Sequence, residues 1–222
     1  MSVTVVINNR NLLTWPRAMV ECIRTYTDLK EIVILDNQST WEPLLAWYKT
    51  GPCRVVNLAQ NFGHKAPWTP IANSNILTDH YVVTDPDLDL SGVPRNVLSH
   101  LAALLRDFPE QGKIGLSLEV KDLTPDLPYF PVVSRWEPSY WEAPLVDDVI
   151  RLAPVDTTFA MYSKSLMNGY RICGARTERP YTARHLPWYV LKPDAEFRYY
   201  LDNAGESCSY KTEMRKIRGV HW

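Results

Sequence analysis

The fold is decided by the stretch His80-Tyr81-Val82-Val83-Thr84-Asp85-Pro86-Asp87-Leu88-Asp89. An apolar run typical of a buried strand comes first, and carboxylates follow it at alternate positions. Mg²⁺ and Mn²⁺ prefer oxygen ligands and keep positions open for phosphate groups. We therefore expect a divalent cation, Mn²⁺ or Mg²⁺, at the end of this strand, with Asp85 and Asp87 as metal ligands. The structural alternative is a helix cap or a solvated acidic turn.

Strands and helices alternate along the chain on both sides of this stretch. The hydrophobic pattern predicts strands over residues 3–7, 31–35, 54–58 and 114–120, and helices from residue 14 and over 41–49, 67–77 and 97–108. This alternation is typical of an α/β fold, a Rossmann-like α/β/α sandwich with a mostly parallel central sheet. Ligands of such sheets bind beyond the carboxyl ends of the strands. The polar loops Asn8-Asn9, Asp36-Asn37 and Asp85-Pro86-Asp87 are therefore expected to meet at one site.

The composition excludes several classes of protein. The 222 residues are enough for one domain with a sizeable core. Lys+Arg 24 against Asp+Glu 25 gives a net charge of -1, which argues against a nucleic-acid partner held by bulk charge. The four cysteines lack the spacing of a zinc site, and they predict reduced thiols in a cytoplasmic protein. The sequence shows no signal peptide and no apolar run of about 20 residues, so no transmembrane segment is expected.

Residues 123–154 differ in character from the rest of the chain. This stretch is rich in proline and aromatic residues, and proline disfavours both a helix interior and a central strand. We therefore predict an ordered loop lined by aromatic side chains, where a sugar acceptor could bind. The alternative is that the rings only complete the core.

Three further stretches, taken with the Asp-X-Asp pair, carry a resemblance to a known family. They are VTVVINNRN at residues 3–11, EIVILDNQST at 31–40 and NLAQNFGHK at 57–65. In this order and spacing they resemble the nucleotide-sugar-dependent glycosyltransferases of GT-A fold, in particular the family-two-like group. The resemblance covers roughly residues 3–90. It implies a GT-A type fold and the transfer of a sugar from a nucleotide-diphosphate sugar donor.

The same resemblance implies which side chains bind the nucleotide sugar. The loop that carries Asn8 and Asn9 matches the first loop of the family, and Asp36 matches the aspartate that contacts the base or ribose. Lys65 follows the glycine of the third loop and is expected to reach a phosphate. Asp85 is expected at the ribose and in the metal shell, with Asp87 as the direct ligand. The acceptor implied is a glycan or a lipid-linked sugar, and the group transferred is a hexosyl or deoxyhexosyl group.

Two residues of the second half complete the predicted site. Asp156 precedes an apolar run, and it is expected to act as the catalytic base if the transfer inverts configuration, because the attacking hydroxyl then needs a proton acceptor. Glu142, Asp147 and Asp148 are the alternatives for this role. His185 lies in a loop rich in arginine and aromatic residues, and it is expected as a further metal ligand, since enzymes of this fold often add a histidine from the C-terminal half. Structurally, Asp156 could instead hold a turn, and His185 could be a hydrogen-bonding histidine.

The residues and the resemblance together predict a single glycosyltransferase domain over residues 1–222. Residues 1–120 form its nucleotide-sugar-binding half and 121–222 its acceptor-side half. Two alternatives stay open. A haloacid-dehalogenase-like phosphatase also uses Asp-X-Asp at a strand end, although Asp89 stands where that class normally has threonine or valine. A catalytically silent carbohydrate-binding module would also use aromatic loops.

Overall fold

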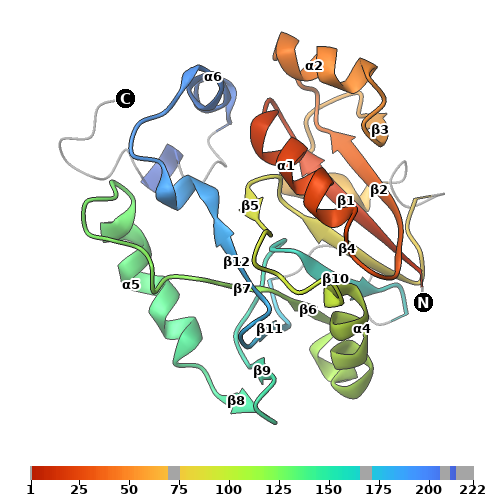
Figure 1. Ribbon diagram of the computed structural model, residues 1–222, viewed down its shortest axis with the longest axis vertical. Coiled ribbons are helices and arrows are strands. Elements are labelled where there is room, and N and C mark those ends of the chain that lie inside the picture. The colour runs from red at the N-terminus through yellow and green to blue at the C-terminus, as the bar shows by residue number, and fades with distance from the viewer. Residues whose placement is uncertain (1, 70–75, 166–171, 206–210, 214–222) are drawn as a thin grey trace.

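The computed structural model describes residues 2–69, 76–165, 172–205 and 211–213 of the chain (Figure 1). Within these residues the chain forms a nine-stranded sheet and a separate three-stranded sheet, with helices packed around them. In Figure 1 the N-terminal strands lie on one side of the molecule, and the helices of the last hundred residues lie on the other.

Four parallel strands form the first part of the large sheet. In spatial order they are β3 (Arg54–Asn57), β2 (Leu29–Asp36), β1 (Val3–Asn9) and β4 (His80–Thr84). β1 is buried at every position, as its run of β-branched side chains predicts. The register pairs Asn9 with Asp36, so the carboxyl ends of these strands reach the same edge of the sheet. The four strands predicted from the sequence in this region are confirmed.

The second part of the large sheet is mixed. Its strands follow β4 in the order β10 (Ala160–Ser163), β6 (Lys113–Gly115), β11 (Ala175–Thr177), β9 (Ile150–Arg151) and β8 (Leu145–Val146). β10 runs antiparallel to both of its neighbours, whereas β6 and β11 are parallel. The α/β class is confirmed, and its parallel character belongs mainly to the first four strands.

The smaller sheet joins distant parts of the chain. Its strands are β5 (Leu88–Asp89), β12 (Thr182–His185) and β7 (Ser117–Leu118). The strand predicted over 114–120 is divided, because the chain leaves the large sheet after β6 and continues as β7. β12 pairs with β5 directly after the Asp-X-Asp pair. A segment of the C-terminal half thereby reaches the end of β4.

Helices cover both faces of the large sheet. α1 (Thr14–Ile23) and α4 (Val97–Asp107) pack against the face that includes Val5, and the region of the short helix η1 (Gly63–Trp68) packs against the face that includes Val6. The other helices are α2 (Glu42–Lys49), η2 (Pro109–Gln111), α5 (Phe130–Trp141), η3 (Leu186–Tyr189) and α6 (Ala195–Asn203). Most of the helix predicted over 67–77 lies outside the described residues. No helix in the described part of the chain has the length and apolar character that crossing a membrane would require.

The prediction of a loop over residues 123–154 is wrong for much of this stretch. α5 is a helix of 12 residues, although it contains two prolines. Pro131 lies in the first turn, where its missing N–H has no partner to lose. Pro138 lies inside the helix, and the buried residues Val132 and Val133 anchor the helix to the core despite the lost hydrogen bond. Tertiary packing therefore outweighs the local effect of proline here.

Candidate active site

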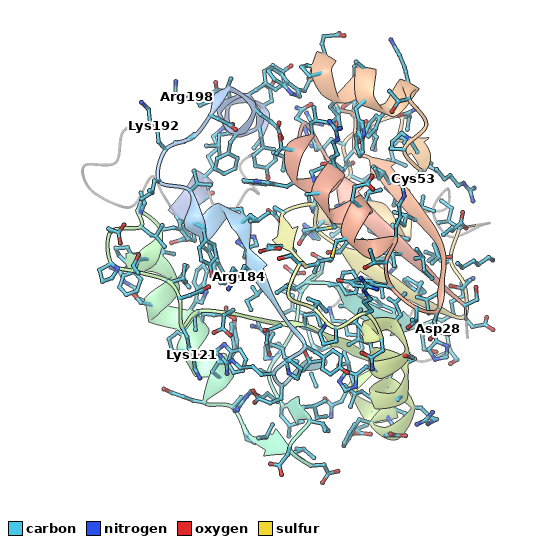
Figure 2. All side chains as sticks on the ribbon, in the orientation of Figure 1. Asp28, Cys53, Lys121, Arg184, Lys192 and Arg198 are labelled. Atoms are coloured by element: carbon cyan, nitrogen blue, oxygen red, sulfur yellow. The ribbon has the colours of Figure 1, made fainter. Side chains whose placement is uncertain are left out.

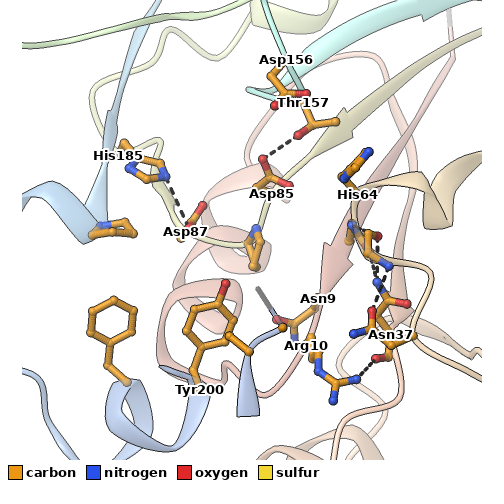
Figure 3. A pocket seen from close by; sticks show the side chains of 18 residues that line it. Asn9, Arg10, Asn37, His64, Asp85, Asp87, Asp156, Thr157, His185 and Tyr200 are labelled. Atoms are coloured by element: carbon orange, nitrogen blue, oxygen red, sulfur yellow. Dashed lines mark hydrogen bonds and ion pairs between the residues drawn. The ribbon is translucent and has the colours of Figure 1, made fainter. Parts of the chain in front are cut away.

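A cavity of about 380 Å³ opens at the carboxyl ends of the parallel strands (Figure 3). The loops after β1, β2 and β4 form one side, as expected from the sequence. Segments of the second half of the chain form the rest of the wall. The charged side chains at the cavity are Arg10, His64, Asp85, Asp87, Asp156 and His185. The polar loops predicted to meet do meet, and Asp156 and His185 join them.

Asp85 is the first residue after β4, and Thr157, in the segment before β10, holds it. The Thr157 hydroxyl donates to Asp85 Oδ2 at 2.6 Å, and the backbone N–H of Asp85 donates to the Thr157 carbonyl at 3.2 Å. Burial raises the pKa of Asp85 to about 8, and the nearby carboxylates of Asp87 and Asp156 add to this effect.

Asp87 and His185 form a close pair on the same side of the cavity (Figure 3). His185 Nε2 lies 3.4 Å from Asp87 Oδ2. The pairing of β12 with β5 causes this proximity, because it places His185 opposite Leu88, and the N–H of Leu186 donates to the Asp87 carbonyl at 2.9 Å. Burial lowers the pKa of His185, but the Asp87 carboxylate outweighs it, so the pKa is raised.

The donor set around Asp87 suits a divalent cation. Asp87 Oδ1 and His185 Nδ1 are buried and have no hydrogen-bond partner among the described residues. Carboxylate oxygen and imidazole nitrogen are both ligands that Mn²⁺ accepts, and Mg²⁺ prefers the oxygens. Within the described residues no three such side chains already form a complete ligand set. The residues present fit a cation that also takes ligands from a bound phosphate, and Asp85 is the nearest further carboxylate.

Asp156 is exposed at the cavity, next to Thr157. Its backbone carbonyl accepts a hydrogen bond from Lys113 Nζ at 2.8 Å, and this ammonium also donates to the Tyr162 hydroxyl at 3.2 Å. Lys113 is completely buried, and burial lowers its pKa to about 8. A buried amino group thus fixes the backbone from which the Asp156 carboxylate enters the cavity.

The three alternatives to Asp156 lie elsewhere. Glu142 directly follows α5, and Asp147 and Asp148 form the turn between β8 and β9. Both aspartates have positive φ, 49° and 56°, as the central residues of a tight hairpin turn do. None of the three lines the cavity. The positive φ values of the turn explain why aspartates stand at positions 147 and 148.

The residues predicted to bind the nucleotide sugar fall into two groups. Asn8 and Asn9 line the cavity, where Asn9 Nδ2 also donates to the Leu12 carbonyl at 2.8 Å. Asp36 is 3% exposed and lies behind the cavity wall, where its carboxylate accepts a hydrogen bond from the N–H of Ser39. Lys65 is exposed and does not line the cavity.

Asn37, which belongs to a loop expected at the site, does line the cavity. Other cavity residues were not predicted as contacts. Arg10 directly follows a predicted contact and His64 precedes one, so their neighbours could have indicated them. Arg10 is held in place because its guanidinium donates to the Asn37 carbonyl at 2.7 Å. Thr157 follows the predicted base directly. Tyr200, on α6, carried no signal in the sequence.

Comparisons with known proteins give similarity at the level of structure. No protein-family model and no curated protein matches the sequence. Among solved structures the chain is similar to TarS of S. aureus, with 13% identity and a TM-score of 0.49 over 97% of this chain and 42% of that chain. It is also similar to glucosyl-3-phosphoglycerate synthase from Mycobacterium tuberculosis in complex with Mn²⁺ and uridine-diphosphate-glucose, with 16% identity and a TM-score of 0.47 over 74% of this chain and 56% of that chain.

The chain spans about half the length of these solved chains, 42% and 56% respectively. At these identities, and with TM-scores below 0.5, the likeness transfers no activity to this chain.

Proposed function

We propose that the chain is a metal-dependent glycosyltransferase that uses a nucleotide-diphosphate sugar. The observation that carries this proposal is that Asp85, Asp87, His185 and Asp156 meet at one cavity, at the carboxyl ends of parallel strands. The group transferred is a hexosyl or deoxyhexosyl group, and the acceptor is a glycan or a lipid-linked sugar. These finer assignments, like a cytoplasmic location, rest on the sequence and stay predictions.

Asp87 and His185, with Asp85 beside them, are the residues that would hold Mn²⁺ or Mg²⁺. The buried atoms Asp87 Oδ1 and His185 Nδ1, which lack hydrogen-bond partners, support this assignment. When bound, the cation would neutralise the charge that develops on the departing diphosphate. Burial and the neighbouring carboxylates raise the pKa of Asp85, and a bound cation would oppose this effect.

The loops after β1 and β2 are the proposed donor side of the cavity. Asn8 and Asn9 line this side of the cavity, Asn9 Oδ1 has no hydrogen-bond partner among the described residues, and Arg10 presents a guanidinium group. Arg10 is thus better placed for a phosphate than Lys65, which is exposed outside the cavity. Asp36 and Lys65 stay predictions as direct contacts.

Asp156 is the proposed general base for an inverting transfer. The acceptor hydroxyl attacks the anomeric carbon, and its proton passes to the Asp156 carboxylate. The bond between the anomeric carbon and the diphosphate oxygen breaks, and the nucleoside diphosphate leaves. Asp156 suits this role because it is exposed at the cavity and lies next to Thr157, which holds Asp85. The hydrogen bond from Lys113 to its carbonyl restricts where the carboxylate can go.

A haloacid-dehalogenase-like phosphatase agrees less well with this site. In that class the position two residues beyond the second aspartate is normally threonine or valine, and in this chain it is Asp89. A silent carbohydrate-binding module would have no need to gather three carboxyl groups in one cavity.

The test compares Asp87→Asn with Asp89→Asn. Asp89 belongs to the same acidic stretch, does not line the cavity, and accepts a hydrogen bond from Ser91. Isothermal titration with UDP, GDP and dTDP is run with and without Mn²⁺. We expect one of these nucleotides to bind only with Mn²⁺, and Asp87→Asn to weaken this binding more than about tenfold, while Asp89→Asn leaves it unchanged.

Unchanged affinity in Asp87→Asn would remove Asp87 as a metal ligand. Failure of all three nucleotides to bind the wild-type chain with Mn²⁺ would contradict the proposed function. Release of inorganic phosphate from p-nitrophenyl phosphate, lost in Asp85→Asn, would favour the phosphatase instead.

A further inference from the structure

Helix α6 forms a wall of the cavity, although it lies far along the chain from the loops opposite. Phe197 and Tyr200 of this helix line the cavity. Their rings stack with centroids 5.9 Å apart and planes at 6°. Figure 3 shows the Tyr200 ring entering the cavity from α6, with its hydroxyl pointing inward and with Asn9 and Arg10 on a neighbouring wall. The cavity therefore has an aromatic wall as well as a polar one.

A carboxylate of α6 caps helix α1. Glu196 Oε1 accepts hydrogen bonds from the backbone N–H groups of Leu13 at 2.7 Å and Thr14 at 2.9 Å. Its other oxygen, Oε2, accepts from the Thr14 hydroxyl at 2.8 Å. α1 has no side-chain cap at Leu13 and no acid in its first turn, so Glu196, 182 residues away from Thr14, supplies what a local cap normally supplies.

Aromatic contacts extend this attachment. Phe197 packs on Trp15 with ring centroids 5.0 Å apart, and Tyr199 packs on Trp41 at 4.6 Å. The Tyr199 hydroxyl lies 3.0 Å from the Thr40 hydroxyl. α6 is thus bound to the starts of α1 and α2, which directly follow the loops that form the polar wall. Any movement of α6 changes the width of the cavity.

The two walls together fit the chemistry of a nucleoside. A nucleobase has a flat face, which stacks on aromatic rings, and polar edges, which bind amide groups. Tyr200 is only partly buried, so its ring offers surface to whatever fills the cavity. On the polar wall Asn8 lines the cavity, and Asn9 Oδ1 has no hydrogen-bond partner among the described residues. The outer face of the same helix is different, since Arg198 is exposed and points away from the molecule (Figure 2).

We propose that Tyr200 contacts the nucleoside part of the bound nucleotide sugar, and that Glu196 is the positioning residue that holds α6 for this contact. The inference rests on the proposed function, because it assigns a donor contact within the same site. It adds a binding residue and a positioning residue from a part of the chain that the sequence motifs do not cover.

The first test compares Tyr200→Ala with Arg198→Ala, a matched change on the outer face of α6. The affinity for UDP, GDP and dTDP is measured with Mn²⁺ by isothermal titration. Loss of a stacking ring should weaken the nucleotide that binds the wild-type chain by about tenfold or more, and Arg198→Ala should leave its affinity unchanged. Tyr200→Phe should keep most of the affinity, because the ring is retained.

The outcomes separate the two proposals. Equal nucleotide affinity in the wild type and Tyr200→Ala would overturn the inference and leave the proposed function in place. Absence of binding in the wild type, with Mn²⁺ present, would overturn both.

The second test concerns Glu196 and uses Glu196→Gln, Glu196→Ala and the control Asp202→Ala, an exposed acid on the same helix. If Glu196 positions Tyr200, Glu196→Ala weakens nucleotide binding. Glu196→Gln should keep much of the affinity, because its amide oxygen still accepts hydrogen bonds from α1. Asp202→Ala should have no effect. Adding Glu196→Ala to Tyr200→Ala should cause little further loss, since both changes remove the same contact.

A purely structural role for Glu196 would lower the melting temperature and leave the Kd of the folded protein unchanged. That result would overturn the positioning role. If Glu196→Ala does not fold, Glu196→Asp, whose shorter side chain loosens the cap on α1, is combined with Tyr200→Ala instead, and fully additive losses in that pair would contradict the coupling.

Discussion

The two parts of the nine-stranded sheet are held together by different forces. In the parallel part, Ile7 and Ile34 are completely buried and pair across the centre of the sheet. An ion pair of this part, Arg54–Glu31, joins partly exposed side chains at 3.7 Å. The parallel part is thus held by apolar burial, and the loops at its strand ends are placed by the backbone ladder itself.

The mixed part adds buried ion pairs to its apolar core. Arg176 and Glu137 form an almost fully buried ion pair between β11 and α5. Arg179 donates twice to Glu119, and its guanidinium stacks 3.8 Å from the centroid of the Trp141 ring. Asp156 and His185 therefore reach the cavity from a region in which buried ion pairs help to fix the geometry. Removal of a charge should therefore matter more there than in the parallel part.

The largest effect is expected for Arg176→Met. This change leaves the buried Glu137 carboxylate without its partner and also removes the hydrogen bond from Arg176 Nε to the Pro154 carbonyl. Breaking such a pair should lower the free energy of unfolding by about 3–5 kcal/mol. The matched change Arg54→Met, at an exposed pair, should cost less than about 1 kcal/mol. Urea unfolding of both variants measures the difference.

Adding Glu137→Leu to Arg176→Met should recover most of the loss, because no buried charge then remains unpaired. A cost for Arg176→Met no greater than that for Arg54→Met would contradict the view that buried ion pairs help to fix the mixed part.

The sequence predicted the parallel part well because its signals are local. The apolar run before Asp85 and the polar residues after each strand lie within a few positions of one another. The register then pairs Thr84 with Ile7, so Asp85 and Asn8 follow at the same edge of the sheet. The structure of the mixed part is determined by contacts between residues that lie far apart in the sequence. α5 keeps Pro138 because its buried face, with Glu137 paired to Arg176, outweighs the local cost of proline.

The same limit applies to the site. His185 could be proposed from residue type and reaches Asp87 through the pairing of β12 with β5. Nothing near Tyr200 or Glu196 in the sequence indicates a cavity, because the contact of Glu196 with Thr14 joins residues 182 positions apart. Such a contact is decided by tertiary packing and has no periodicity or motif that a single sequence can show.

A smaller effect is expected for Ile34→Val in the parallel part. Loss of one buried methylene should lower the free energy of unfolding by about 0.5–1.5 kcal/mol, whereas the same change at Ile172, which is 65% exposed, should have no measurable effect. The cost at Ile34 should be the same in 0.1 M and 1 M NaCl, because it is apolar. A cost that changes with salt would show that charge also holds this part of the sheet.

The smallest effect concerns Glu119 and depends on pH. Burial alone would raise the pKa of Glu119, but the hydrogen bonds from Arg179, at 2.8 and 2.9 Å, outweigh it and lower the pKa from 4.5 to about 2. A carboxyl whose folded pKa is depressed contributes stability above its unfolded value, and this contribution is lost as pH falls from about 4.5 towards 2. Both side chains are partly exposed, so solvent screening limits the contribution to about 1 kcal/mol or less.

The measurement is the urea midpoint at pH 7, 4.5 and 3 for the wild type, Glu119→Gln and the exposed control Glu110→Gln. Glu119→Gln should be less stable than the wild type at pH 7, and the difference should shrink at pH 3, because the wild-type carboxylate has by then lost part of its advantage. Glu110→Gln should follow the wild type at every pH. If the difference in urea midpoint between the wild type and Glu119→Gln is the same at every pH, Arg179 is held by its stacking on Trp141 and not by the carboxylate. Packing would then stabilise this contact, as it stabilises the parallel part.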